Sequence, residues 1–131
     1  MSETRGLADL ADDACQAIRR INHLTVRGPA VPAPQLYEVL GSLKQLGPAL
    51  EQALTQLGDA LEQSLSEYAV YEDDGVDPAS SVAICCAALT HAASSAARLG
   101  DLLEQAHQAI ARQGYRTALA SAFHGGSVPE T

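Results

Sequence analysis

Apolar residues recur at helical intervals of three and four along two long segments of this chain, and no other feature constrains the fold as strongly. This spacing places one apolar stripe on each of two α-helices, as in a helical hairpin or a coiled coil. We therefore predict an all-α protein built on two long helices. The first stripe comprises Leu36, Leu40, Leu43, Leu50, Leu54, Leu57, Leu61, Leu65 and Tyr68, and the second comprises Val82, Cys85, Leu89, Ala92, Ala96, Leu99, Leu103, Ala106 and Ile110.

A shorter amphipathic segment precedes these two helices. It predicts a helix that begins near Ser2 or Thr4 and ends near Leu24, before Gly28. Residues 28–34 contain prolines at positions 29, 32 and 34, so they predict an extended linker and not a helix. The inner face of this first helix is predicted to hold Leu7, Leu10, Ala14, Ala17, Ile18 and Ile21.

Three local signals define the limits of the long helices. Pro48 follows Gly47 inside the first stripe, so we expect either a kink or a division of that helix there. Asp77 followed by Pro78 predicts an N-cap and the first residue of the third helix. That helix is expected to end near residue 113, with Gly114 as its left-handed terminator.

These elements predict a three-helix up-down bundle built on a long antiparallel helical hairpin, with the first helix packed along part of it. Residues 115–123 are weakly amphipathic and predict a short C-terminal helical segment. At 131 residues the chain fits one domain, so we expect a single helical-bundle domain over residues 1–124 and a disordered tail over 125–131.

The composition argues against several classes of function. The formal net charge is −8 and no basic stripe is present, which disfavours direct nucleic-acid binding. No unbroken apolar run approaches the ~18 residues of a membrane span, and the N-terminal segment lacks the apolar core of a signal peptide. With three cysteines, two of them adjacent, a disulfide framework is disfavoured. We expect a cytoplasmic protein that does not bind membranes.

Two groups of residues could carry chemistry. Glu104 and His107 form one E-x-x-H pair, whereas carboxylate-bridged metal bundles use two such pairs. Cys86 and His91 are five residues apart and do not share a helix face. We therefore expect no catalytic residue, metal or cofactor, and a metal- or small-ligand-binding bundle that uses Glu104 and His107 is the alternative.

A possible interaction patch combines polar residues at the end of the first helix with part of the first long stripe. The polar members can bind a partner or satisfy the terminal carbonyls of their own helix. The patch comprises Arg19, Asn22, His23, Leu50, Leu54 and Leu57.

Several short motifs resemble a set of small helical proteins from high-GC Gram-positive bacteria. The motifs are Ala11-Asp-Asp-Ala14, Ala17-Ile-Arg19, Ile21-Asn-His23, Leu36-Tyr-Glu-Val-Leu-Gly41 and Asp77-Pro78. The resemblance covers most of residues 7–112 and implies a small helical bundle. It implies no activity and no binding residues.

The chain is also similar in outline to the WXG100 hairpins of type VII secretion. Those proteins are acidic antiparallel hairpins, and Tyr68-Ala-Val-Tyr-Glu72 matches their Y-x-x-x-[DE] export pattern. The chain departs from the family because it has no Trp and therefore no W-x-G turn, and because its pattern precedes a helix. A type VII secretion-associated protein is a second alternative.

Taken together, the residues predict a non-enzymatic helical protein-protein interaction module that binds a second copy or a helix from another protein. A first helix of about 21 residues spans ~32 Å and cannot cover a hairpin of ~50 Å. The uncovered length is the expected binding surface, so a homodimer or a complex with a protein partner is expected.

Overall fold

The computed structural model describes residues 2–117, and these residues form helices and connecting segments without any strand. The predicted all-α class is therefore confirmed. The helices are α1 (Ser2–Val26), α2 (Ala33–Leu43), α3 (Leu46–Glu67) and α4 (Pro78–Ala109). The chain divides into two compact units, residues 1–31 and residues 32–131, which we describe separately.

The first unit contains α1, a single amphipathic helix that begins and ends close to the predicted positions. All of its residues from Leu7 to Val26 are exposed, including the six that were predicted to form an inner face. Near the end of the helix, the Thr25 hydroxyl donates to the carbonyl oxygens of Ile21 (2.8 Å) and Asn22 (3.3 Å). The Thr25 side chain is thus bonded back to its own helix, to the backbone three and four residues earlier.

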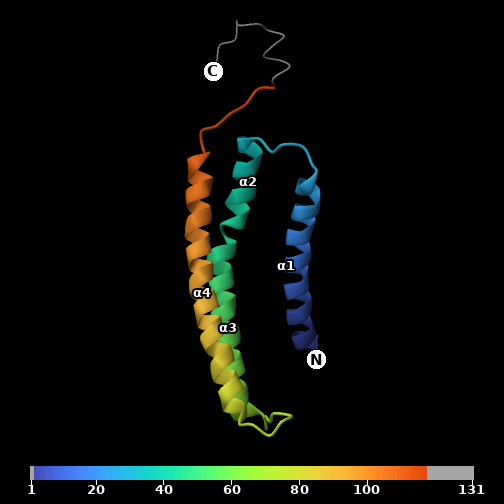
Figure 1. The fold of residues 1–131 in the computed structure, drawn as a ribbon, viewed down its shortest axis with the longest axis vertical. Helices are drawn as coiled ribbons and strands as arrows, with labels where there is room; N and C mark the ends of the chain where they lie inside the picture. The colour runs from blue at the N-terminus through green and yellow to red at the C-terminus, as the bar shows by residue number, and fades with distance from the viewer. Residues whose placement is uncertain (1, 118–131) are drawn as a thin grey trace, which may run out of the picture. The chain divides into compact units, whose positions relative to one another are not determined.

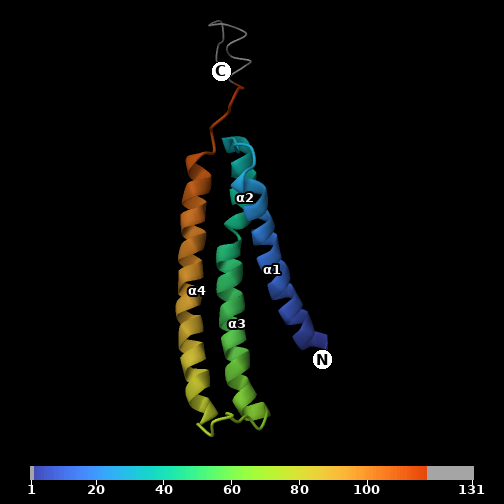
Figure 2. The same ribbon diagram turned by 45° about the vertical axis from the view of Figure 1, so that its right-hand side comes forward.

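In the second unit, α3 and α4 run side by side in opposite directions, and α2 lies against the C-terminal part of α4 (Figures 1 and 2). Three glycines mark the antiparallel register. Gly58 lies beside Cys86, Gly47 beside Gly100, and Gly41 beside His107. The core of this unit is therefore a long, thin layer between two helices.

The first long segment is interrupted at Lys44 and Gln45, between α2 and α3. Pro48 is the cause, because it has no N–H to donate to the carbonyl oxygen of Lys44 four residues earlier. That carbonyl accepts instead from the N–H of Gly47, at 3.3 Å. Pro48 itself lies in the first turn of α3, where a missing N–H costs little.

The start of α4 is as predicted, whereas its end is not. The Asp77 side chain caps α4 by accepting from the N–H of Ala79 at 3.0 Å, and Pro78 follows at the first helical position. The helix ends at Ala109, and Gly114 does not adopt the predicted left-handed conformation. The cause lies in turns such as that from Ala111 N–H to Gln108 O (3.2 Å), which satisfy terminal carbonyls without a left-handed residue.

Two further predictions concern the C-terminal end. Of the predicted helical segment 115–123, residues 115–117 are not helical, and the remainder lies outside the described residues. The tail predicted for residues 125–131 also lies outside them.

Candidate functional site

The contact between α3 and α4, which we call the seam, follows a strict heptad spacing. On α4 the seam is formed by Val82, Cys86, Leu89, Ala93, Ala96, Gly100 and Leu103, and on α3 by Gly47, Leu54, Gly58, Leu61 and Leu65. The α4 row continues with the same spacing through His107, which lies beside α2, and Ile110, which follows the last residue of the helix. These residues are buried or half-buried. Leucines fill much of the seam, and the small residues Gly47, Gly100 and Ala96 let the two helix axes approach closely at one crossing point.

The predicted stripe on α4 has the wrong phase at every second position. Cys85, Ala92, Leu99 and Ala106 were expected in the contact, but each is exposed, and the residue that follows it lies in the seam instead. Leu99 is 42% exposed while Gly100 is buried. At this pair the close approach of the two backbones selects the glycine, because a leucine would not fit between them.

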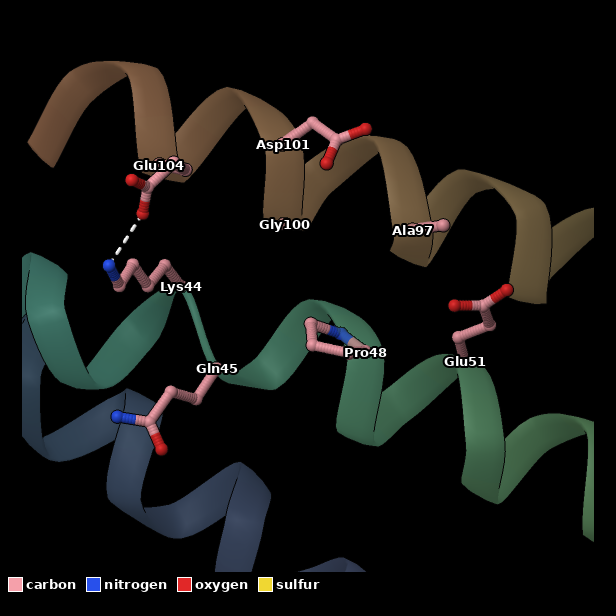
Figure 3. A pocket seen from close by; sticks show the side chains of 8 residues that line it. All are labelled: Lys44, Gln45, Pro48, Glu51, Ala97, Gly100, Asp101 and Glu104. Atoms are coloured by element: carbon pink, nitrogen blue, oxygen red, sulfur yellow. Dashed lines mark hydrogen bonds and ion pairs between the residues drawn. The ribbon is translucent and has the colours of Figure 1, made fainter. Parts of the chain in front are cut away.

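Residues that follow a seam position form a polar face on one side of the hairpin. Thr55, Asp59 and Glu62 of α3 line a hollow together with Thr90 and Ser94 of α4, so both rows lie on the same side. A second hollow of about 350 Å³ lies on this side near the break between α2 and α3. Its lining includes Lys44, Pro48, Glu51, Asp101 and Glu104 (Figure 3).

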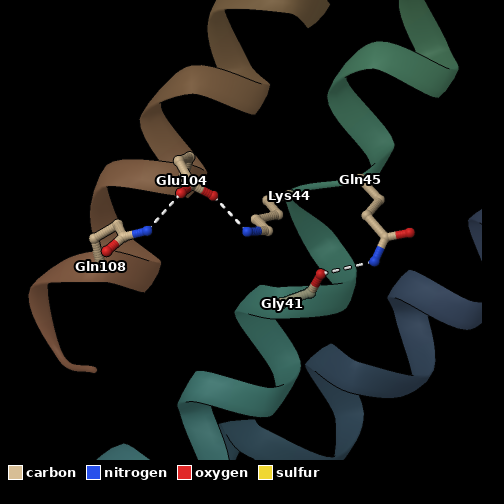
Figure 4. A network of polar contacts seen from close by, with 5 residues as sticks. All are labelled: Gly41, Lys44, Gln45, Glu104 and Gln108. Atoms are coloured by element: carbon tan, nitrogen blue, oxygen red, sulfur yellow. Dashed lines mark hydrogen bonds and ion pairs between the residues drawn. The ribbon is translucent and has the colours of Figure 1, made fainter. Parts of the chain in front are cut away.

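A small polar network closes one end of that second hollow. Lys44 Nζ donates to Glu104 Oε1 at 2.5 Å, and Gln108 Nε2 donates to Glu104 Oε2 at 2.7 Å (Figure 4). These hydrogen bonds, from Lys44 first and then from Gln108, hold the pKa of Glu104 below its usual value. The carboxylate is thus occupied on both oxygens by protein donors.

The E-x-x-H pair is divided between two environments. His107 is only 7% exposed, and its ring stacks on Tyr37 with centroids 3.8 Å apart. Its Nδ1 atom is buried without a hydrogen-bond partner. Because Glu104 faces Lys44 instead, these two residues do not form a joint ligand set. Among residues 2–117, no group of three or more His, Cys, Asp or Glu side chains is placed to hold a metal ion.

The adjacent cysteines also point to different surroundings. Cys86 lies in the seam, where its thiol donates to the carbonyl oxygen of Gly58 at 3.4 Å. Partial burial, followed by the nearby Glu62, Cys85 and Asp59, raises the pKa of Cys86. A raised pKa reduces the thiolate fraction and so disfavours Cys86 as a nucleophile. Cys85 is exposed on the other side.

Exposed residues one position before the heptad positions of the seam, with position 51 counted as one of them on α3, occupy the side opposite the polar face, and we call this surface the apolar face. It comprises Leu46, Leu50, Ala53, Leu57 and Ala60 of α3, and Cys85, Ala88, Ala92, Ser95, Leu99, Leu102, Ala106 and Ala109 of α4. All of these residues are exposed and none is charged. The hairpin therefore presents two opposite surfaces, one carrying carboxylates and one carrying leucines and alanines.

The predicted interaction patch falls on three different surfaces. Leu50 and Leu57 belong to the apolar face, and Leu57 is 46% exposed, whereas Leu54 lies half-buried in the seam. Arg19 and His23 line a shallow hollow on α1, and Asn22 lies exposed on the same helix. Sequence reasoning missed the pairs Lys44–Glu104 and Tyr37–His107, because nothing near either residue in the sequence indicates its distant partner.

The helix α4 also bears on the membrane prediction. By length and composition alone it could cross a membrane, although the expectation from unbroken apolar runs was that no segment could. The difference arises because Ser, Thr and His residues interrupt the runs without adding charge. Length and composition do not distinguish a membrane-crossing helix from the core helix of a soluble bundle.

Compared with known protein families, curated proteins and solved structures, the chain shows no match.

Proposed function

We propose that this protein is a non-enzymatic helical interaction module whose docking surface is the apolar face of the α3–α4 hairpin. One observation carries the proposal: a heptad-spaced, uncharged apolar surface is exposed on both helices, opposite a face that holds carboxylates. Heptad spacing suits contact with another helix, since each exposed row can accept side chains from a partner. A large exposed apolar patch is a usual sign of an interaction surface.

The proposal includes a role for α1, which carries a row of the same spacing. This row is Leu7, Leu10, Ala14, Ala17, Ile21 and Leu24, and all of it is exposed. In the proposed bundle, α1 packs along part of the apolar face as a third helix. At 1.5 Å per residue the α1 row spans ~26 Å, and the face along α4 spans ~36 Å. The remaining length is available to a partner.

Thiol labelling of the full chain tests this proposal. Leu50→Cys and Leu57→Cys place reporters on the apolar face, and Thr55→Cys places a matched reporter on the polar face of the same helix. The native cysteines are replaced by Ala in each variant, and helicity is checked by circular dichroism. We expect labelling at position 50 to be at least about tenfold slower than at position 55, because a helix that covers the face excludes the reagent.

Two controls make the result interpretable. Labelling in denaturant supplies the intrinsic rate of each reporter, and a series of protein concentrations separates coverage within one chain from coverage by another. Equal rates at positions 50, 55 and 57 at every concentration would contradict the proposal.

A further inference from the structure

The helix α2 is joined to α3 through a break, and it lies against the C-terminal part of α4. We propose that α2 is a hinged flap, which swings away from α4 about Lys44 and Gln45 while the α3–α4 hairpin stays intact. In the open position the last turns of α4 are uncovered. This inference concerns a second state of the molecule, so it goes beyond the proposed function and does not rest on it.

The break between α2 and α3 has the backbone pattern of a hinge. Pro48 cannot donate to the carbonyl oxygen of Lys44, so regular helical bonding stops there. The Gln45 N–H donates to Ser42 O at 3.2 Å. The Gly47 N–H donates to Lys44 O at 3.3 Å, so both bonds reach only three residues back. A short stretch of this pattern inside a longer helical segment often marks a hinge.

The two sides of the break are held unequally. On the α3 side, Gly47 is buried at the close crossing of the two backbones, next to Gly100. On the α2 side, Lys44 and Gln45 line the hollow of about 350 Å³, so movement there meets open space and not packed side chains (Figure 3). A rotation about the break therefore moves α2 and leaves α3 in place.

The helix α2 buries little of its own surface. None of its 11 residues is buried, whereas α4 contains five buried residues. Its residues Leu36 and Val39 are 37% and 38% exposed. An isolated helix of this length is marginal in water, and segments with little buried apolar area open locally before the rest of a domain. The closed position of α2 therefore depends on a few specific contacts.

Two contacts with α4 fasten α2 in the closed position. The Tyr37 ring stacks on His107, with centroids 3.8 Å apart and planes inclined by 17°. Directly after the helix, Lys44 Nζ donates to Glu104 Oε1 at 2.5 Å (Figure 4). The side chains of this ion pair are 29% and 43% exposed, so solvent screens it. The flap is thus fastened by one ring contact and one screened ion pair.

The closed position also has an unfavourable contribution at His107. This residue is only 7% exposed, and its Nδ1 atom is buried without a hydrogen-bond partner. Gly41 of α2 lies so close that an added Cβ would be 3.2 Å from His107 Nε2. A buried nitrogen without a partner has lost its hydration, and water regains access to it when α2 swings out. The contact that fastens the flap therefore also reduces the free energy needed to open it.

Thiol labelling of the full chain measures the opening. Leu40→Cys places a reporter at a half-buried position of α2, and Leu54→Cys places a matched reporter at a half-buried position of the seam. The native cysteines are replaced by Ala in each variant, and labelling in denaturant supplies the intrinsic rates. We expect position 40 to label at least about tenfold faster than position 54, because α2 opens without the hairpin.

Substitutions at the two fastenings complete the test. Tyr37→Ala should raise the labelling rate at position 40 by about tenfold, because the stacked ring pair is lost, and should leave position 54 unchanged. Glu104→Gln should raise the rate at position 40 by about twofold. Val39→Ala removes an apolar side chain from α2, and Asp101→Asn removes a carboxylate from α4, without loss of either fastening. Neither control should change the rate at position 40.

Three results would overturn the flap. Equal labelling at positions 40 and 54 in the native background would show that α2 and the hairpin open together. Equal acceleration of both positions by Tyr37→Ala would show the same, and no acceleration at position 40 would show that the ring contact does not fasten α2. All three leave the proposed function untouched, because that proposal is tested by the rates at positions 50, 55 and 57.

Discussion

The two adjacent sides of α4 carry similar numbers of apolar residues but use them differently. On the seam side, Ala93 and Ala96 are buried, and Ala96 is only 4% exposed. On the apolar face, Leu99 and Leu102, which directly precede the seam residues Gly100 and Leu103, remain 42% and 47% exposed. Near the crossing of the two helices, the small side chains are buried and the leucines beside them are left outside.

This difference shows that the position of closest backbone approach decides which side becomes the contact. An added Cβ at Gly47 would lie 2.4 Å from Gly100 Cα and 2.8 Å from the Ala96 carbonyl oxygen. Only a pair of glycines permits this crossing. The seam at this crossing thus depends on shape, whereas Leu99 and Leu102 on the apolar face keep exposed area that a partner can bury.

The largest expected effect comes from breaking the seam at its tightest point. We expect Gly47→Ala to lower the free energy of unfolding by about 3 kcal/mol, because the new methyl group meets backbone atoms that cannot rotate away. Gly58→Ala is the matched control, since its Cβ would make an ordinary contact at 3.5 Å with the Leu89 side chain. That variant should be unchanged or more stable by up to ~1 kcal/mol, because Ala favours helix. Urea denaturation measures the free energy of unfolding of both variants. An equal loss in Gly47→Ala and Gly58→Ala would contradict this account of the seam.

A second prediction exchanges residue size between the two sides of α4. Ala96→Leu should cost about 1–3 kcal/mol of stability, because the seam has no room for three additional carbons. Leu99→Ala should cost less than ~1 kcal/mol, since its side chain is already partly exposed in the hairpin. The same Leu99 variant should weaken any association measured by light scattering. If Leu99→Ala proved as destabilising as Ala96→Leu, the distinction between seam and face would be wrong.

Sequence reasoning succeeded where the signal was local. The all-α class, the limits of α1 and the cap at Asp77 depend on periodicity or on neighbouring residues, and the structure agrees with them. The interruption near Pro48 was also expected, although the sequence did not decide between a kink and a division. Such features follow from backbone chemistry within one turn of helix.

The phase of α4 could not be obtained in this way. Two heptad rows run beside each other on α4, and a search for apolar residues selects the row that contains Leu99 over the row that contains Gly100. Only the partner helix reveals that a glycine is needed opposite Gly47. The burial of His107 was not predicted for the same reason, since it depends on Tyr37 and Gly41 far away in the sequence.

A third prediction concerns the cap that fixes where both rows of α4 begin. Asp77→Ala should lower stability by about 1 kcal/mol, because the N–H of Ala79 loses its acceptor. Asp73→Ala removes the same charge from the same turn without removing this cap. Thermal denaturation of the two variants should separate capping from charge. Asp77→Ala should weaken association only as far as its loss of stability explains. Leu99→Ala, in contrast, should weaken association with little loss of stability.

The smallest effect is expected on the polar face, where Glu104 is paired with Lys44. The pKa of Glu104 is lowered in the folded chain by hydrogen bonds from Lys44 and Gln108. A carboxyl whose folded pKa is depressed contributes stability above its unfolded pKa of about 4.3, and this contribution disappears as pH falls through the folded value. The urea midpoints of the native chain and Glu104→Gln should therefore differ slightly at pH 7 and converge as the pH falls through the lowered pKa of Glu104. Asp101→Asn removes a carboxylate from the same face but leaves the Lys44 pair intact, so its difference from the native chain should not follow this pH dependence.

The Lys44–Glu104 pair lies opposite the apolar face, so neither Glu104→Gln nor Asp101→Asn should change the association measured by light scattering. A change in association in either variant would show that the two faces are not independent.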